Sequence, residues 1–225
     1  MTTTYGTTEP DSRGRTGLDR VGRDLDRNPD VVVRDVQVTS DGWHVLRRTT
    51  FDVRGSDGTW TTQQRETYDR GNGAAVLPVD RARGTVLLTR QFRFPAYVND
   101  HPDGMLVEVA AGLLNEDDPE TAIRREALEE LGVRLDDLRH VTAAYMSPGS
   151  VTERVHCYVA EYSPADRVEV GGGLAGEGED IEVLELPATE ALAMIDDGRI
   201  VDGKTILLLQ WAALHGLVAG QHDQS

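Results

Sequence analysis

The stretch Ala110–Val133 constrains the chain most, because its second half predicts a helix with two defined ends. Pro119 suits the first helical turn, where its missing N–H would be unpaired in any case. Gly132 suits the position just past the end, where a positive φ is accessible without a Cβ. At about 100° per residue, the apolar residues of this helix share one arc that can face a core: Ile123, Ala127, Leu128 and Leu131.

Three carboxylates fill a second arc beside the apolar one: Glu126, Glu129 and Glu130. As a solvated face this arrangement is unfavourable, because like charges at i,i+3 and i,i+4 repel each other. A divalent cation would remove the repulsion, and Mg²⁺ in particular takes oxygen ligands from carboxylates, phosphates and water. Arg125 lies four residues before Glu129, close enough to orient it. The alternative interpretation is a solvated acidic helix without a ligand.

The segment Arg125–Val133 resembles the second half of the Nudix box, G-x5-E-x7-R-E-U-x-E-E-x-G-U with U apolar, at every fixed position. The first half departs from it. Counting from Gly112, Asp118 stands where the family has Glu, and the spacer to Arg125 is one residue short. A shortened box of this kind is similar to that of the GDP-mannose pyrophosphatase branch, so we interpret it as a marker of that branch.

Other motifs resemble the same branch, which also lies close to the ADP-ribose pyrophosphatases. They follow in order over about residues 30 to 218: Arg65–Gly73, Arg90–Arg93, Ala111–Leu114, Tyr145–Gly149, Val151–Glu153, Glu179–Pro187 and Asp202–Thr205. Pro148 occupies a position past the box that is typical of members that cleave nucleoside-diphosphate sugars.

Alternation of apolar residues predicts mixed strands, followed by two late helices, which is an α+β composition. The expected strands are Val31–Thr39, Trp43–Val53, Thr59–Tyr68, Ala74–Val79, Gly84–Phe92, Met105–Ala111, Arg139–Tyr145, Arg154–Tyr162 and Ile181–Leu186. The late helices are expected over Pro187–Asp197 and Gly203–Ala219.

The resemblance implies a Nudix α/β/α sandwich preceded by a small N-terminal antiparallel β subdomain. We therefore expect a disordered tail over 1–29, the β subdomain over 30–70, the Nudix hydrolase domain over 71–219 and a short tail over 220–225. Because three strands bury little apolar surface alone, the subdomain must pack on the rest of the chain or on a second chain. The resemblance implies the second arrangement, because the family swaps this subdomain across a homodimer.

The net charge of −16 and the pI near 4.7 argue against binding to nucleic acid or to anionic membranes. Cys157 is the only cysteine, which excludes an internal disulfide and favours a reducing, cytoplasmic location. We find no run of 18 apolar residues and no signal-peptide pattern.

The resemblance implies a metal site for Mg²⁺, with Mn²⁺ as a substitute. Its ligands would be the carboxylates of Glu126 and Glu130, the backbone carbonyl of Ala111, and Glu179 from the glycine-rich loop Gly171–Asp180. On composition alone, that loop could equally be a linker. Glu129 is expected to assist as an auxiliary catalytic group.

Hydrolysis of a pyrophosphate requires a water molecule in line with a phosphorus atom and neutralisation of the oxygens that gain charge. Our candidate general base is Glu153, in the loop after Pro148. The alternatives are Glu130 or Glu129, with Glu153 then an ordinary surface residue.

The resemblance also implies substrate contacts. Arg93 can pair bidentately with a phosphate group, and Lys204, the only lysine, matches a position that reaches the sugar nucleotide. Gly112, Leu113 and Glu153 complete the contacts within the subunit. Residues expected to act across the dimer are Trp43, stacking on the base, and Gln64, Arg65 and Glu66, reading it. Gln64 stands where the family has lysine, so the resemblance does not decide which nucleotide base the protein prefers.

The leading expectation is a Mg²⁺-dependent hydrolase that converts GDP-mannose to GMP and mannose 1-phosphate. The alternative substrate is ADP-ribose, giving AMP and ribose 5-phosphate. An alternative of another class is a sensor that binds a sugar nucleotide without cleaving it, although every carboxylate of the helical half-box is present.

Overall fold

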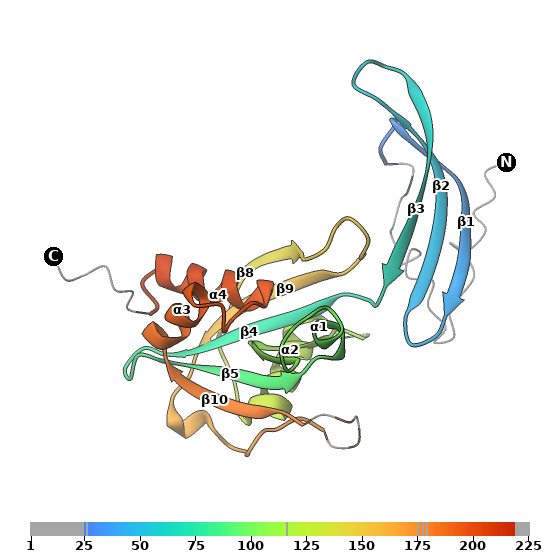
Figure 1. Ribbon diagram of the computed structural model, residues 1–225. Coiled ribbons are helices and arrows are strands. Elements are labelled where there is room, and N and C mark those ends of the chain that lie inside the picture. The colour runs from blue at the N-terminus through green and yellow to red at the C-terminus, as the bar shows by residue number, and fades with distance from the viewer. Residues whose placement is uncertain are drawn as a thin grey trace. The chain divides into compact units, whose positions relative to one another are not determined.

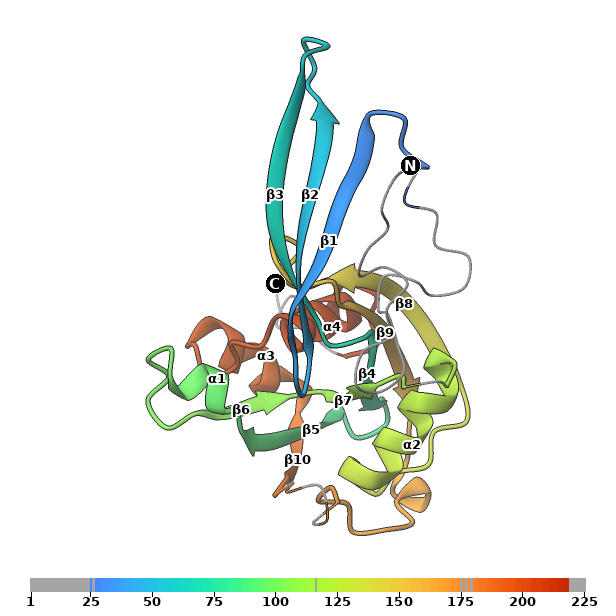
Figure 2. The same cartoon turned by 90° about the vertical axis from the view of Figure 1, so that its right-hand side faces the viewer.

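The computed structural model describes Leu25 and residues 27–115, 117–174, 176, 178 and 180–218. The expected tails, 1–29 and 220–225, lie almost wholly outside this range. The chain divides into two compact units. Of the described residues, the small unit comprises those up to Gly71 together with Tyr145–Glu153, and the large unit comprises Asn72–Ala144 and those from Arg154 onward. Figures 1 and 2 together label the strands and α-helices of both.

The small unit is an antiparallel sheet in the order β1-β2-β3. Its strands are β1 (Val31–Asp41), β2 (Val45–Arg54) and β3 (Trp60–Asp69). The three strands match the expected ranges to within two residues at each end, since the alternation that predicts them reflects one covered face. The α+β expectation with an N-terminal antiparallel sheet is thus confirmed.

The segment Tyr145–Glu153 is tied to this sheet by backbone hydrogen bonds. The N–H of Tyr68 donates to the carbonyl of Ser150 at 2.8 Å, and the N–H of Thr152 donates to the carbonyl of Tyr68 at 3.0 Å. The hydroxyl of Thr152 also donates to Asp69 at 3.1 Å. The loop that carries the candidate base therefore belongs structurally to the small unit.

The large unit contains a seven-stranded mixed sheet in the order β10-β5-β4-β9-β8, with β6 paired to β5 and β7 paired to β4. Its strands are β4 (Gly73–Asp80), β5 (Thr85–Phe92), β6 (Met105–Glu108), β7 (Ala110–Leu113), β8 (Leu138–Tyr145), β9 (Arg154–Glu161) and β10 (Glu182–Pro187). Only β4 and β9 run parallel among the neighbours for which a register is given.

Strands β4 and β5 pair with each other only at Val79↔Val86 and Asp80↔Thr85. Beyond that point the β6–β7 segment enters between them, with β6 on the end of β5 and β7 on the start of β4. The expected single strand Met105–Ala111 is wrong in this respect. It breaks at Val109, because the N–H of Val109 bonds to the hydroxyl of Thr205 at 2.8 Å instead of to a neighbouring strand.

Helices cover both sides of the large sheet (Figure 2). On one side α2 (Pro119–Leu131) packs its buried Ile123, Ala127 and Leu131 into the main hydrophobic cluster. On the other side α3 (Ala188–Asp196) contacts β5 and β10, and α4 (Gly203–Leu214) contacts β4 and β9. This is the expected α/β/α sandwich.

Two short elements were not expected, and one helix end differs. The segment Phe94–Tyr97 forms one helical turn, α1, which is favoured by Pro95 at its start, and Pro164–Asp166 forms a 3₁₀ turn, η1. Helix α4 ends at Leu214, earlier than the expected Ala219, which lies outside the described residues.

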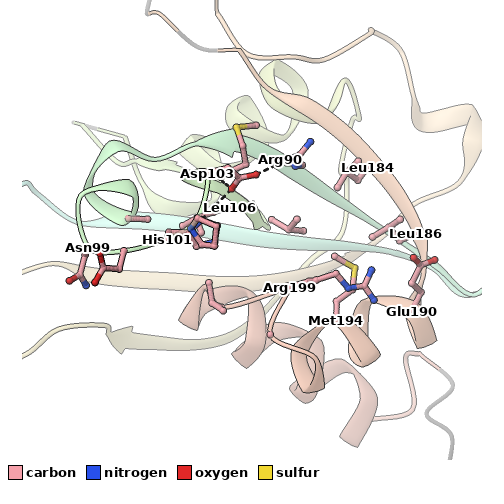
Figure 3. Close-up of a pocket in the computed structure, with 17 residues that line it drawn as sticks. Arg90, Asn99, His101, Asp103, Leu106, Leu184, Leu186, Glu190, Met194 and Arg199 are labelled. Carbon is pink, nitrogen blue, oxygen red and sulfur yellow. Dashed lines mark hydrogen bonds and ion pairs between the residues drawn. The ribbon is translucent and has the colours of Figure 1, made fainter.

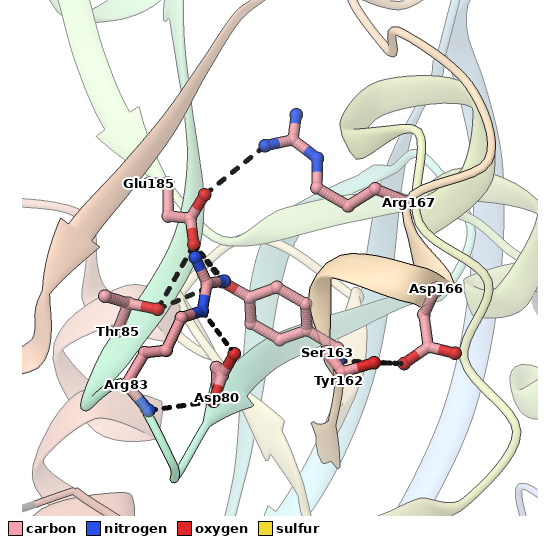
Figure 4. Close-up of polar contacts among 8 residues, drawn as sticks. All are labelled: Asp80, Arg83, Thr85, Tyr162, Ser163, Asp166, Arg167 and Glu185. Carbon is pink, nitrogen blue, oxygen red and sulfur yellow. Dashed lines mark hydrogen bonds and ion pairs between the residues drawn. The ribbon is translucent and has the colours of Figure 1, made fainter.

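The β4–β5 turn is anchored by a partly buried polar cluster around Glu185 of β10 (Figure 4). The Glu185 carboxylate pairs with Arg83 and accepts hydrogen bonds from Tyr162 at 3.1 Å and Thr85 at 3.3 Å. Arg83 also donates to Asp80 at 2.6 Å. Burial raises the pKa of the Tyr162 hydroxyl to about 12. These contacts fasten together the ends of β4, β9 and β10 where β5 begins.

Among the helices of the described chain, none combines the length and apolarity needed to cross a bilayer.

Candidate active site

The helix that carries the three carboxylates is fixed at its start by Asp118. Its carboxylate accepts the N–H of Glu120 at 3.0 Å and the N–H of Thr121 at 3.1 Å, which satisfies two otherwise unpaired donors. The hydroxyl of Thr121 donates to the same carboxylate at 2.6 Å and, with these backbone bonds, lowers the pKa of Asp118. The residue that departs from the family pattern is therefore an N-cap.

Glu126 lies directly against the backbone of Gly112 in β7. A Cβ built on Gly112 would overlap the Glu126 carboxyl group. Only glycine leaves room for that carboxylate at this place, which explains in steric terms why the box begins with a glycine.

Glu130 is buried, with 3% of its surface exposed, and its Oε2 accepts the N–H of Ala111 at 3.1 Å. The structure thus brings Ala111, Gly112, Glu126 and Glu130 together where α2 meets β7. A buried carboxylate needs hydrogen bonds or a cation to offset its lost hydration, so this placement is consistent with a metal ligand.

The donor set here is two carboxylates and the nearby carbonyl of Ala111, which are hard oxygen ligands suited to Mg²⁺. The fourth expected ligand, Glu179, lies outside the described residues. Within the part of the chain that the structure describes, no group of three or more His, Cys, Asp and Glu side chains is arranged to hold a metal. The space that Gly112 leaves for Glu126 and the burial of Glu130 support the fit of a divalent cation.

Arg125 holds two of the carboxylates in place. Its guanidinium pairs with Glu129 at 3.0 Å and with Glu126 at 2.9 Å. Partial burial acts to lower the pKa of Arg125, but the two carboxylates overcome it and raise the pKa above its ordinary value. The expected contact between Arg125 and Glu129 is present, and it reduces the repulsion along the acidic arc.

The glycine-rich loop begins by docking on the C-terminal end of α2. The N–H of Gly172 donates to the carbonyl of Glu130 at 2.9 Å, and that of Gly173 donates to the carbonyl of Glu129 at 3.0 Å. Gly171 has φ 75, and a Cβ there would lie 2.6 Å from the Glu130 carbonyl oxygen. Close approach of two backbones therefore requires glycine, and residues 171–173 are not a free linker.

Two expected substrate contacts, Arg93 and Lys204, converge on a residue that the sequence analysis missed. Glu108 accepts Nε of Arg93 at 2.7 Å and Nζ of Lys204 at 2.6 Å. Lys204 also donates to Asp202 at 3.0 Å. Burial acts to lower the pKa of Lys204, but both carboxylates outweigh it and raise the pKa. The available signal was a single glutamate inside the apolar run Met105–Ala111.

The remaining candidates, apart from Leu113, lie in the small unit. Trp43 is 86% exposed, and the exposed Gln64 and Arg65 bond to their neighbours on the sheet, Gln64 to Thr50 at 3.2 Å. Glu66 is exposed as well. Glu153 pairs with Arg70 at 3.4 Å. Leu113, at the end of β7, pairs with Gly73 in the large unit.

A cavity of about 980 Å³ in the large unit lies elsewhere (Figure 3). Leu184 and Leu186 of β10 line it, whereas Val183, the residue before Leu184 in the same strand, packs on the cluster beneath α2, so the cavity is on the opposite face of the sheet. Arg90, at its edge, pairs with Glu182 at 3.3 Å. None of the expected site residues lines this cavity.

Comparison with known proteins identifies both parts of the chain. A family model described as the GDP-mannose pyrophosphatase NudK N-terminal domain matches residues 30–68, and the NUDIX domain model matches residues 69–209. A protein from Yersinia enterocolitica named GDP-mannose pyrophosphatase is 54% identical over 182 residues, which cover 81% of this chain and 94% of that protein. Proteins of the same name from Pectobacterium atrosepticum and Klebsiella pneumoniae are 52% and 48% identical, covering 81% and 86% of this chain and 94% and 96% of their own lengths.

Proposed function

Since this chain belongs to the Nudix family, we propose that it is a pyrophosphatase of nucleoside-diphosphate sugars, which converts GDP-mannose to GMP and mannose 1-phosphate. The relatives that carry the name GDP-mannose pyrophosphatase align over about four-fifths of the chain, including the small unit. A likeness that extends beyond the Nudix domain favours the same substrate class, because the small unit holds the expected base-reading residues.

The observation that carries the catalytic part of this proposal is the junction of α2 with β7. The carboxylates of Glu126 and Glu130 lie against the backbone of Gly112 and Ala111, which is the oxygen-rich arrangement that a divalent cation requires. A sugar-nucleotide sensor without turnover would have no need of this arrangement.

We assign Mg²⁺ to this place, with Mn²⁺ as a substitute. Glu126, Glu130, the carbonyl of Ala111 and Glu179 would hold it. When bound, such a cation lowers the pKa of water and offsets the charge that phosphate oxygens gain. The docking of Gly172 and Gly173 on α2 supports the inclusion of Glu179, because it starts the glycine-rich loop beside Glu129 and Glu130.

The other side chains bind and orient. Arg125 holds Glu126 and Glu129 in fixed rotamers, and Arg93 and Lys204 bind phosphate oxygens. Glu153 is the proposed acceptor of the proton from the attacking water, and Glu129 and Glu130 are the alternatives. Gly112 and Leu113 contact the substrate through their backbone on β7.

We propose a homodimer in which the small unit is shared, so that Trp43, Gln64, Arg65 and Glu66 serve the site of the second subunit. Support comes from the exposed aromatic side chains of the three-stranded sheet: Trp43, Trp60 and Tyr68. A sheet of this size buries too little apolar surface to be stable alone. Sedimentation equilibrium tests the dimer, and an active monomer would contradict it.

The function is tested by phosphate release in a phosphatase-coupled assay. GDP-mannose, ADP-ribose and ADP-glucose are each supplied with Mg²⁺, with Mn²⁺ and with chelator. The proposal is supported if phosphate is released faster from GDP-mannose than from the other two substrates, and if no phosphate is released in chelator. A preference for ADP-ribose would assign the protein to the alternative substrate. That alternative is motivated by Gln64, which replaces the lysine that the family has at this position. Saturable binding without turnover of any substrate would indicate a sensor.

A further inference from the structure

Glu108 is a charged residue in a place that ordinarily takes an apolar one. It ends β6 within the run Met105-Leu106-Val107-Glu108-Val109-Ala110 and is 3% exposed. Removing a carboxylate from water is unfavourable unless it is paired and hydrogen-bonded. A residue so placed must therefore be offset by specific partners.

The partners of Glu108 are Arg93 and Lys204, the two cations that we propose to bind phosphate oxygens. Its Oε2 accepts Nε of Arg93 at 2.7 Å, and its Oε1 accepts Nζ of Lys204 at 2.6 Å. Each oxygen of one buried carboxylate thus fixes one cation, although Arg93 and Lys204 come from the end of β5 and the start of α4.

The Lys204 side is braced a second time. Asp202 accepts Nζ of Lys204 at 3.0 Å through Oδ1, while its Oδ2 caps α4 by accepting the N–H of Thr205 at 2.9 Å. The hydroxyl of Thr205 in turn accepts the N–H of Val109 at 2.8 Å. The strand that carries Glu108 and the helix that carries Lys204 are therefore held in a fixed position relative to each other.

This arrangement leaves donors on both cations. The Arg93 side chain is 40% exposed, and among the described residues its Nε is the only guanidinium atom with a side-chain partner. The Nη1 and Nη2 edge, which matches two phosphate oxygens, is left for a ligand. Lys204 uses two of its three N–H donors on Glu108 and Asp202 and retains one.

The cation pair is also connected to the carboxylate site. Ala111, whose N–H binds Glu130, follows Glu108 by three residues of nearly extended chain, which spans about 10 Å. One short segment, Glu108–Gly112, thus carries the anchor of the cations at one end and the contacts to Glu126 and Glu130 at the other.

We propose that Glu108 is a positioning residue, which orients Arg93 and Lys204 so that together they bind the diphosphate beside the carboxylate site. Glu108 acts through these two side chains and does not contact the substrate. The proposal rests on the proposed function for the identity of the substrate.

The test is Glu108→Gln, which keeps the shape of the side chain but replaces one charged acceptor with an amide donor facing a cation. We expect KM for GDP-mannose to rise by about 10- to 100-fold, because a misplacement of about 1 Å is worth up to about 100-fold, with a smaller change in kcat. The dependence of turnover on Mg²⁺ concentration should stay as in the wild type.

A double-mutant cycle separates positioning from general damage. Glu108→Gln is combined with Lys204→Met. We expect Glu108→Gln to raise KM by a smaller factor in the Lys204→Met background than in the wild type, because one of the two cations that Glu108 positions is then already absent. Independent, multiplicative effects would overturn the proposal. The matched control is Thr89→Val, which removes a buried hydrogen bond to the backbone carbonyl of Glu108 at 3.1 Å without touching its carboxylate. It should leave KM unchanged.

Calorimetric binding of GDP-mannose in chelator distinguishes the failure of this inference from that of the function. If the wild type binds but does not turn over, the proposed function fails while a weaker Kd in Glu108→Gln still supports the positioning role. An unchanged Kd overturns it, as does a wild type that neither binds nor cleaves. Should Glu108→Gln not fold, Glu108→Asp keeps the charge but is too short to reach both cations, and it must show the same rise in KM.

Discussion

Glu130 and Ala111 are joined by a hydrogen bond of 3.1 Å from the backbone N–H of β7 to the buried carboxylate of α2. This contact sets the distance between the acidic helix and the strand whose next residue, Gly112, makes room for Glu126. The two carboxylates are therefore positioned by the same four-residue strand.

Glu130→Gln should abolish turnover while the protein remains folded. The amide oxygen can still accept the N–H of Ala111, so the packing survives, but a neutral ligand binds a divalent cation poorly. We expect a loss in kcat of more than about 100-fold, since even the outer partners of metal ligands are worth about 10- to 100-fold. Steady-state kinetics with a thermal melt measures both. Glu120→Gln, an exposed change on the same helix, is the control, and full activity in Glu130→Gln would remove the metal assignment.

Gly112→Ala should displace the Glu126 carboxylate, because the added Cβ would occupy its position. We expect kcat/KM to fall by at least about tenfold, with a higher Mg²⁺ concentration needed for half-maximal rate. A titration of activity against Mg²⁺ makes the measurement. Gly42→Ala, where a Cβ meets nothing within 4 Å, controls for the loss of a glycine. An unaltered Mg²⁺ titration in Gly112→Ala would contradict the placement of Glu126.

Asp118 should make stability dependent on pH. Its pKa in the folded protein is lowered from 3.8 by hydrogen bonds from the Thr121 hydroxyl and backbone and from Glu120. A lowered pKa means that the stabilisation is present above the unfolded value and is lost as pH falls through the folded one. Asp118→Asn caps the helix equally well but does not titrate. Between pH 6 and pH 3 the wild type should therefore lose more Tm than the variant, and parallel curves would exclude the effect.

Tyr162→Phe should lower stability without altering activity. The hydroxyl bonds to Glu185 at 3.1 Å and approaches Thr85 at 3.3 Å in a partly buried cluster (Figure 4). Loss of a hydrogen bond to a charged group costs about 2 kcal/mol, or several degrees in Tm for a chain of this size. Chemical denaturation gives the value, and the exposed Tyr97→Phe is the matched control. Lower kcat in Tyr162→Phe would show that the cluster reaches the active site.

Local patterns accounted for the elements that carry the site. Helix α2 begins at Pro119 and ends before Gly132 as expected, since its caps are local. The split of Met105–Ala111 into two strands could not be predicted from the local sequence, because its cause is a hydrogen bond of Val109 to the hydroxyl of Thr205, 96 residues away. No periodicity within a strand reports such a partner.

The same limit applied to Glu108 and to the loop that carries Glu153. The partners of Glu108 lie 15 and 96 residues from it in the chain, so the sequence showed only an unexplained charge among apolar residues. The loop joins the small unit through backbone bonds of Tyr68 with Ser150 and Thr152, which residue types do not reveal. Composition and residue spacing do not reveal contacts that the main chain makes between residues far apart in the sequence.

The glycines docked on α2 allow the C-terminal end of that helix to be followed by amide hydrogen exchange. The amide protons of Gly172 and Gly173 are held by the carbonyls of Glu130 and Glu129, so they exchange with solvent only when the contact opens. Their exchange rates therefore time the separation of the glycine-rich loop from the acidic helix. In a protein with three successive glycines at this place, two amide resonances report whether the loop is docked on the helical turn that carries Glu129 and Glu130.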